Sequence, residues 1–252
     1  MTKPLFSVIT ITLDNLEGLK RTHESLQGQS TGNYEWIVID GGSQDGSKEY
    51  LPHTNSLWIS EPDHGIYEAM NKGIERTRGS YLIFMNAGDQ FAAPDTLEKI
   101  QPAIAETKPD FIYGDALEEN FYKYSRPHKK TWQGMFTHHQ AMLYRRTALG
   151  DLRYDLRYKI AADYDFTIRF LQRAENILYC PFPICLFENG GISQLEALRG
   201  RREQFYIRKE AGQNLPGNIF IFAAQTLNLF LRRKCPRLYR FLKMRQRQAG
   251  NT

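Results

Sequence analysis

The sequence has few cysteines, no long apolar run and none of the glycine-rich signatures of the commonest nucleotide-binding folds. Its three cysteines, Cys180, Cys185 and Cys235, include no CxxC pair, so we expect neither a disulfide framework nor a zinc site. No stretch reaches the roughly 18 apolar residues of a membrane span, and the first residues lack the pattern of a signal peptide. These absences favour a cytoplasmic protein in a reducing compartment.

The glycines at residues 41–46 do not follow a familiar nucleotide motif. The segment GGSQDG lacks both the GxGxxG spacing of dinucleotide-binding folds and the GK[ST] of a phosphate-binding loop. Hydride transfer and ATP hydrolysis therefore lose their main support in the sequence, and no internal repeat or low-complexity segment is present.

Apolar runs alternate with helical patterns through most of the chain. At 252 residues with 41% hydrophobic residues, the chain is long enough for one large α/β domain and an appendage. The pattern predicts strands at residues 6–13, 35–39, 57–60, 81–85, 111–113 and 141–144. It predicts helices at residues 17–26 after an Asn15 cap, 66–77, 97–106 and 161–173, and a turn at Gly114 and Asp115. This alternation implies right-handed crossovers and a mainly parallel sheet.

Two acids follow strands that we expect to be central. Asp89 comes after the apolar run at residues 81–85, and Asp40 closes the run at residues 35–39. Ligands bind at the carboxyl edge of open parallel sheets, so both acids are candidate site residues. The alternative is ordinary turn or capping chemistry, for which an Asp beside glycine is well suited.

Six sequence blocks occur in an order that resembles family 2 glycosyltransferases of the GT-A fold, similar to bacterial enzymes of exopolysaccharide synthesis of the colanic-acid type. They are SVIT (7–10), IDGGSQDGS (39–47), EPDHGIYEAMNKG (61–73), NAGD (86–89), HQA (139–141) and ADYDF (162–166). The resemblance extends over roughly residues 6–194. It implies a mainly parallel GT-A sheet flanked by helices, followed by a helical basic extension.

The resemblance implies a nucleotide site at the sheet edge. It implies that Asp40 accepts a hydrogen bond from the nucleobase and that Thr10 and Thr12 line the same pocket. Asp63 and Lys72 would lie near the diphosphate, although Lys72 also suits a solvated helix face. Asn86, in the NAGD block, is the sixth nucleotide-binding candidate.

The resemblance also implies a divalent metal, Mg²⁺ or Mn²⁺, which would stabilise the departing diphosphate. Asp89 is the expected ligand and His139 a weaker one, with a wall histidine as the alternative. The family usually has a second acid before this Asp, whereas this chain has Gly88. We therefore expect a single protein carboxylate, aided by phosphate and water ligands.

Asp163 is the candidate catalytic base. The first Asp of the family's DYD block corresponds to it, and a carboxylate there would accept the proton of the acceptor hydroxyl. Its local alternative is a first-turn helix acid, and Asp165 is the less favoured base. One base opposite a leaving nucleotide predicts inversion by direct displacement.

Residues 114–134 combine aromatic and basic side chains. They suit either an acceptor wall or simple packing. Binding of single-stranded nucleic acid is disfavoured because no RNA-binding motif accompanies them.

The carboxyl-terminal tail is strongly basic. Residues 199–247 contain thirteen Lys or Arg, and the apolar stretch at 219–231 adjoins Arg232, Arg233 and Lys234. This pattern suits a helix lying on an anionic membrane surface, with a core-packed helix or a homodimer contact as alternatives.

Together these features predict an inverting glycosyltransferase at the inner face of the cell membrane. Its donor would be a nucleotide diphosphate sugar, with UDP favoured and GDP the other candidate. Its acceptor would be a lipid-linked oligosaccharide in bacterial surface polysaccharide synthesis. The expected division is a catalytic domain at 1–195, with a donor half to about residue 115 and an acceptor half beyond it, and an extension at 196–252. The alternative is a noncatalytic membrane-attached module that binds nucleotide sugars.

Overall fold

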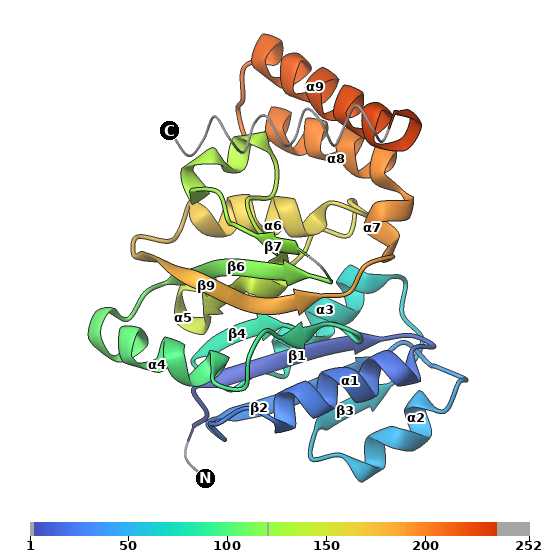
Figure 1. The fold of residues 1–252 in the computed structure, drawn as a ribbon, viewed down its shortest axis with the longest axis vertical. Helices are drawn as coiled ribbons and strands as arrows, with labels where there is room; N and C mark the ends of the chain where they lie inside the picture. Colours follow the sequence, from blue (N-terminus) through green and yellow to red (C-terminus); the bar gives the residue numbers. More distant parts are fainter. Residues whose placement is uncertain (1–2, 120, 236–252) are drawn as a thin grey trace.

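The computed structural model describes residues 3–119 and 121–235, which form one mixed sheet flanked by helices (Figure 1). The strand order is β3-β2-β1-β4-β8-β6-β9-β5, and β7 pairs with β6. Strands β1, β2, β3, β4, β6 and β9 share one direction, while β5, β7 and β8 run against it. The predicted α/β class with a mainly parallel sheet is confirmed.

The strands are β1 (Phe6–Thr12), β2 (Tyr34–Asp40), β3 (Leu57–Ser60), β4 (Tyr81–Phe84), β5 (Gln90–Phe91), β6 (Phe111–Glu118), β7 (Phe121–Lys123), β8 (Met142–Arg145) and β9 (Ile177–Phe187). The helices are α1 (Leu16–Gln27), α2 (Ser47–Tyr50), α3 (Ile66–Glu75), α4 (Thr96–Thr107), α5 (Arg146–Leu149), α6 (Ala162–Leu171), α7 (Ile192–Leu195), α8 (Ala197–Glu210) and α9 (Leu215–Lys234). Short 3₁₀ turns lie at η1 (Leu51–His53), η2 (His128–Gln133) and η3 (His139–Ala141).

The central strands are apolar on both faces because each face meets a helical layer. Ile9 and Ile11 of β1 belong to the core that includes α3 and α6, whereas Val8 belongs to the core beneath α1 and α4. Helix α1 begins as predicted, because the Asn15 side chain accepts a hydrogen bond from the Gly18 amide at 3.0 Å.

The predicted turn at Gly114 and Asp115 is wrong, because β6 continues to Glu118. Its pairing with β9 shifts register at these two residues. Asp115 is buried and accepts hydrogen bonds from the Ser125 amide at 2.7 Å and from the Tyr122 and Tyr179 hydroxyls at 2.8 Å. These three donors stabilise a carboxylate inside the sheet, so the chain does not turn there.

Strand β9 was not predicted, because Pro181 and Pro183 interrupt its apolar pattern. The register shift lets both prolines fit beside β6, and the residue that follows β9, Glu188, contacts Asp89 through its backbone amide.

Helices α8 and α9 pack together at the end of the molecule farthest from α2 and β3, with α6 between α8 and the sheet (Figure 1). The predicted boundary near residue 195 falls at the end of α7, and the division into domains stays a prediction. No helix in residues 3–119 and 121–235 is both long and apolar enough to cross a membrane.

Candidate active site

The carboxyl ends of β1, β2, β3 and β4 meet at one edge of the sheet. Thr12 pairs with Asp40, and Asp40 pairs with Ser60 in the next strand. The Ala87 amide donates to Ile11 O at 3.1 Å, which fixes the NAGD segment beside the end of β1. The structure thus brings together the acids that the sequence placed at separate strand ends.

Asp40 is fully buried at this edge and already accepts several hydrogen bonds. One oxygen accepts from the Ser60 hydroxyl at 2.6 Å, and the Ser43 hydroxyl and amide bind the same carboxylate. Asp63 lies over the neighbouring Gly41, because a Cβ there would be 2.8 Å from an Asp63 carboxylate oxygen. Asp40 therefore shapes the loop at residues 41–43, and a nucleobase would meet this carboxylate only by displacing a serine.

Thr10 and Thr12 differ in what their hydroxyls do. The Thr10 hydroxyl donates to Met85 O at 2.7 Å and accepts from Trp36 Nε1 at 2.9 Å, so it braces the sheet. The Thr12 hydroxyl is buried and has no hydrogen-bond partner among the described residues. Of the two, Thr12 retains the capacity to bind a ligand.

Asp89 is buried directly before β5, at the end of the segment that follows β4, and its carboxylate accepts hydrogen bonds from two directions. Its Oδ1 accepts from the Glu188 amide at 2.9 Å, and its Oδ2 accepts from Gln140 Nε2 at 2.6 Å. Burial raises the pKa of Asp89 to about 6, against the lowering effect of both hydrogen bonds. The Gln140 side-chain oxygen is also buried and lacks a partner in the described part of the chain.

Glu188 brings a second carboxylate that the sequence did not point to. A Cβ on Gly88 would lie only 1.7 Å from a Glu188 carboxylate oxygen, and Gly88 has φ of +106°. The Glu188 carboxylate, which forms an ion pair with Arg21, therefore occupies the space that a side chain at position 88 would need. The expected single carboxylate ligand stays a prediction, and the structure adds Glu188, which reaches the space beside Gly88 from the end of β9.

Three further side chains lie in a row beside Asp89 and Glu188, in the order Asn86, His139 and Asp163. Asn86 Nδ2 lies 3.3 Å from His139 Nε2, and His139 Nδ1 lies 3.7 Å from Asp163 Oδ2. If Asn86 donates to Nε2, the imidazole proton is on Nδ1 and faces Asp163. The Asn86 side-chain oxygen is buried without a partner in the described segments.

Asp163 lies in the first turn of α6, and its side chain is 21% exposed. Its Oδ1 is 3.5 Å from the Tyr67 hydroxyl and accepts from the Tyr164 amide at 2.8 Å. Asp165 instead forms an ion pair with Arg169. Asp163 is thus the acid of this motif that faces the site.

Lys72 reaches the sheet edge but is engaged by two acids. Its ammonium lies 2.8 Å from Glu61 and 3.4 Å from Glu68, and hydrogen bonding to Glu61 raises the pKa of Lys72. A diphosphate would have to compete with both carboxylates for this cation.

The oxygen donors around Asp89 suit a hard divalent cation. Asp89 and Glu188 supply carboxylates, and the unpartnered Gln140 oxygen lies on the same amide that binds Asp89. No group of three or more His, Cys, Asp or Glu in the part of the chain that the structure describes could hold a metal ion alone. The residues present therefore fit a divalent ion that takes its other ligands from outside this set of side chains.

Comparisons with known proteins agree with this arrangement. The family model for glycosyl transferase family 2 matches residues 7–153. The chain is 33% identical over 187 residues to a PGL/p-HBAD biosynthesis glycosyltransferase of Mycobacterium tuberculosis (strain ATCC 25618 / H37Rv), covering 67% of this chain and 70% of the relative. An uncharacterized glycosyltransferase of the same strain is 33% identical over 205 residues, covering 75% of this chain and 77% of the relative.

Solved structures show the same fold at low sequence identity. TarS of S. aureus in complex with UDP-GlcNAc superposes with a TM-score of 0.66 at 16% identity, over 90% of this chain and 72% of that one. A mannosyltransferase of Pyrobaculum calidifontis in complex with GDP-Man and Mn²⁺ superposes with a TM-score of 0.66 at 16% identity, over 91% of this chain and 70% of that one. The GT-A arrangement is confirmed, and the named relatives favour an enzyme over a noncatalytic module. The chain therefore belongs to glycosyl transferase family 2 and is a transferase enzyme.

Proposed function

We propose that this enzyme transfers a sugar from a nucleotide diphosphate sugar to an acceptor hydroxyl with inversion at the anomeric carbon. The observation that carries this proposal is the position of Asp163, whose partly exposed carboxylate lies 3.7 Å from His139 beside the strand ends of the donor edge. The acceptor oxygen attacks the anomeric carbon while its proton passes to Asp163. The bond from that carbon to the diphosphate oxygen breaks, and the nucleotide leaves with the electron pair.

Replacement of the base tests this reaction. We expect Asp163→Asn to lower kcat by roughly 10²- to 10⁴-fold, because an amide cannot accept the proton. Donor affinity, measured by calorimetry, should stay unchanged, and the exposed Asp151→Asn is the matched control. Nuclear magnetic resonance of the wild-type product gives the anomeric configuration. Retention of configuration, or near-normal turnover by Asp163→Asn, would contradict the proposal.

The donor site is proposed at the shared edge of β1, β2 and β4. UDP-sugars are the favoured donors and GDP-sugars the second choice, since solved relatives of this fold bind UDP-GlcNAc and GDP-Man. The unpartnered Thr12 hydroxyl and the Asp40 carboxylate supply polar groups for the nucleoside. Asp63 and Lys72 would contact the diphosphate if the ion pairs of Lys72 with Glu61 and Glu68 break.

Mg²⁺ or Mn²⁺ is proposed beside the diphosphate, held by Asp89 and Glu188 with the Gln140 oxygen. When bound, such an ion stabilises negative charge on the departing nucleotide. His139 remains a weaker candidate ligand, since its Nε2 meets Asn86. A thermal-shift screen of UDP- and GDP-sugars, each with and without Mn²⁺, tests donor and metal together, because ligands bound only to the native state raise its stability. No shift with any of these donors would contradict the site.

The proposed acceptor is a lipid-linked oligosaccharide, and α9 supplies the support for it. The face of α9 opposite its buried residues exposes Ile219, Phe220, Leu227 and Phe230, with 74% of Phe220 accessible. Lys234 is exposed on this face at the end of the helix. Apolar burial and positive charge together favour reversible attachment to an anionic membrane surface.

Vesicle co-sedimentation tests this attachment. We expect Phe220→Ser/Phe230→Ser to release the protein from anionic vesicles, while Phe121→Ser, which removes an exposed aromatic far from α9 in the sequence, should not. The side chains of Arg232 and Arg233 and all of residues 236–252 lie outside the described structure, so their predicted contribution stays a prediction. Sedimentation equal to that of the wild type would leave the α9 face as a homodimer surface.

These features support a peripheral enzyme at the inner face of the membrane, acting in bacterial surface polysaccharide synthesis. The mycobacterial relative is named for PGL/p-HBAD biosynthesis. Chemical analysis of the reaction product made from a lipid-linked and from a water-soluble saccharide would decide the acceptor class.

A further inference from the structure

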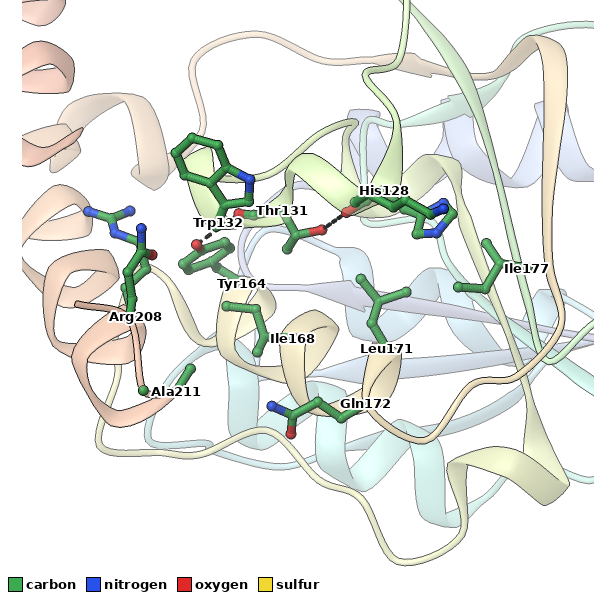
Figure 2. Close-up of a pocket in the computed structure, with 13 residues that line it drawn as sticks. His128, Thr131, Trp132, Tyr164, Ile168, Leu171, Gln172, Ile177, Arg208 and Ala211 are labelled. Carbon is green, nitrogen blue, oxygen red and sulfur yellow. Dashed lines mark hydrogen bonds between the residues drawn. The ribbon is translucent and has the colours of Figure 1, made fainter. Parts of the chain in front are cut away.

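A pocket of about 520 Å³ lies between η2, α6 and the carboxyl end of α8 (Figure 2). Trp132, Tyr164, Ile168, Leu171 and Ile177 give it a largely apolar wall. None of the candidate donor, metal or base residues lines it. Its volume falls within the range of roughly 300–1,000 Å³ that is typical of small-molecule sites.

Arg208 lines this pocket and is 1% exposed. Its Nε donates to Asn218 Oδ1 at 2.7 Å, but its Nη1 and Nη2 are buried and have no hydrogen-bond partner among the described residues. Asn218 is neutral and its own amide group donates to Phe205 O at 2.9 Å. A guanidinium carries five N–H donors, so most of the donors on this cation are unsatisfied within the described chain.

The groups around Arg208 compensate the positive charge of its guanidinium only in part. Arg208 lies in the last turn of α8, where the partial negative charge of the helix end favours a cation. The Tyr164 hydroxyl lies close enough to Arg208 that the charge of the guanidinium and hydrogen bonding from it both oppose the rise that burial causes in the pKa of Tyr164. The hydroxyl donates its own proton to Thr131 O at 2.8 Å. Neither feature supplies the planar, two-oxygen acceptor that a buried guanidinium binds best.

We propose that this pocket binds a small amphiphile that carries one acidic group. A phosphate or carboxylate would accept from the free Nη atoms of Arg208, and a short alkyl or aryl body would lie along Ile168, Leu171 and Ile177. Lys129, at the pocket wall, adds positive charge for the same anion. The site requires no part of the donor-binding proposal, since its residues come from η2, α6, α8 and the start of β9.

Calorimetric titration of the whole protein tests the site with four probes: decyl phosphate below its micelle concentration, decanoate, decanol and inorganic phosphate. We expect saturable one-to-one binding of decyl phosphate or decanoate, and binding of decanol and of inorganic phosphate at least roughly tenfold weaker, because both the charge and the apolar body contribute. Arg208→Met should weaken binding of the charged amphiphile by roughly tenfold or more. Lys209→Met, which removes the exposed charge one residue along α8, should change it less than about twofold.

Arg208→Met need not unfold the protein, since apolar replacement of a buried cation is often neutral for stability. A thermal melt checks this, and Trp132→Ala provides a second variant at a half-exposed position. It should weaken decyl phosphate binding several-fold without affecting inorganic phosphate. Failure of every probe to bind saturably, equal affinity for decanol and decyl phosphate, or wild-type affinity in Arg208→Met would each overturn the proposal.

Discussion

The raised pKa of Asp89 predicts a measurable cost of holding this carboxylate in place. Burial raises its pKa from 3.8 to about 6 in the folded protein. The unfolded chain releases the proton near 3.8, so increasing pH through this interval favours the unfolded state. Above pH 6 both states are ionised and the full penalty of about 3 kcal/mol remains.

Asp89→Asn should remove the penalty without losing the local hydrogen bonds. An asparagine oxygen can accept from the Glu188 amide, and its Nδ2 can donate to the Gln140 side-chain oxygen once the Gln140 amide turns over, because Gln140 Nε2 faces this position in the wild type. The free energy of unfolding of the variant relative to the wild type should increase by about 1.4 kcal/mol between pH 5 and pH 8. Stability should therefore increase at neutral pH while activity is lost.

Urea unfolding in a chelator at several pH values measures this difference, with the exposed Glu49→Gln as the matched control. Addition of Mn²⁺ with UDP at pH 8 should then stabilise the wild type and the control but not Asp89→Asn. Parallel stability curves for wild type and Asp89→Asn from pH 5 to pH 8 would refute the reasoning. Equal stabilisation of that variant by Mn²⁺ and UDP would remove Asp89 from the metal site.

Three further predictions concern the surroundings of this acid and the sheet. Gly88→Ala should lower the free energy of unfolding by roughly 1–3 kcal/mol more than Gly190→Ala, because Gly190 has a similar φ but open space around it. In a double-mutant cycle, Glu188→Ala should restore part of this difference. Equal losses of stability at the two glycines would contradict a clash between a side chain at position 88 and Glu188. Glu188→Gln should weaken Mn²⁺ binding in the presence of UDP by roughly tenfold, as read by electron paramagnetic resonance, and an unchanged spectrum and affinity would exclude it as a ligand. Asp115→Ala should cost roughly 2–4 kcal/mol in urea unfolding, because it leaves three donors unpaired, whereas the exposed Asp151→Ala should cost little.

Local patterns predicted most of the amino-terminal half. Apolar runs placed β1, β2, β3 and β4 to within a residue or two, and the Asn15 side chain caps α1 as expected. These features depend on neighbours in the sequence, and both faces of the central strands are covered by helices. Where a local signal competed with long-range contacts it failed, as at Asp115, which reads as a turn residue but lies in a strand whose donors come from Tyr122, Ser125 and Tyr179.

The candidate site was predicted in part for the same reason. Strand-end acids such as Asp40 and Asp89 can be read from the sequence, because parallel strands end at a common edge. Glu188 could not, since nothing in its own segment connects it with Gly88. The absence of a side chain at Gly88 was the one available signal, and it indicates that another group fills the space.

By itself, the sequence determined the strands β1 to β4 and the helices α1, α3 and α4, the acids at the strand ends and the family, because these depend on residue type and spacing along the chain. Only the tertiary structure decided which groups those acids contact. It joined Asp89 to the backbone amide of Glu188, 99 residues away, engaged Lys72 with two glutamates and left Arg208 buried without an acidic partner among the described residues. The physical reason is that burial and pairing set the protonation state of each side chain and its availability for further contacts. Burial and pairing both depend on segments that folding brings together.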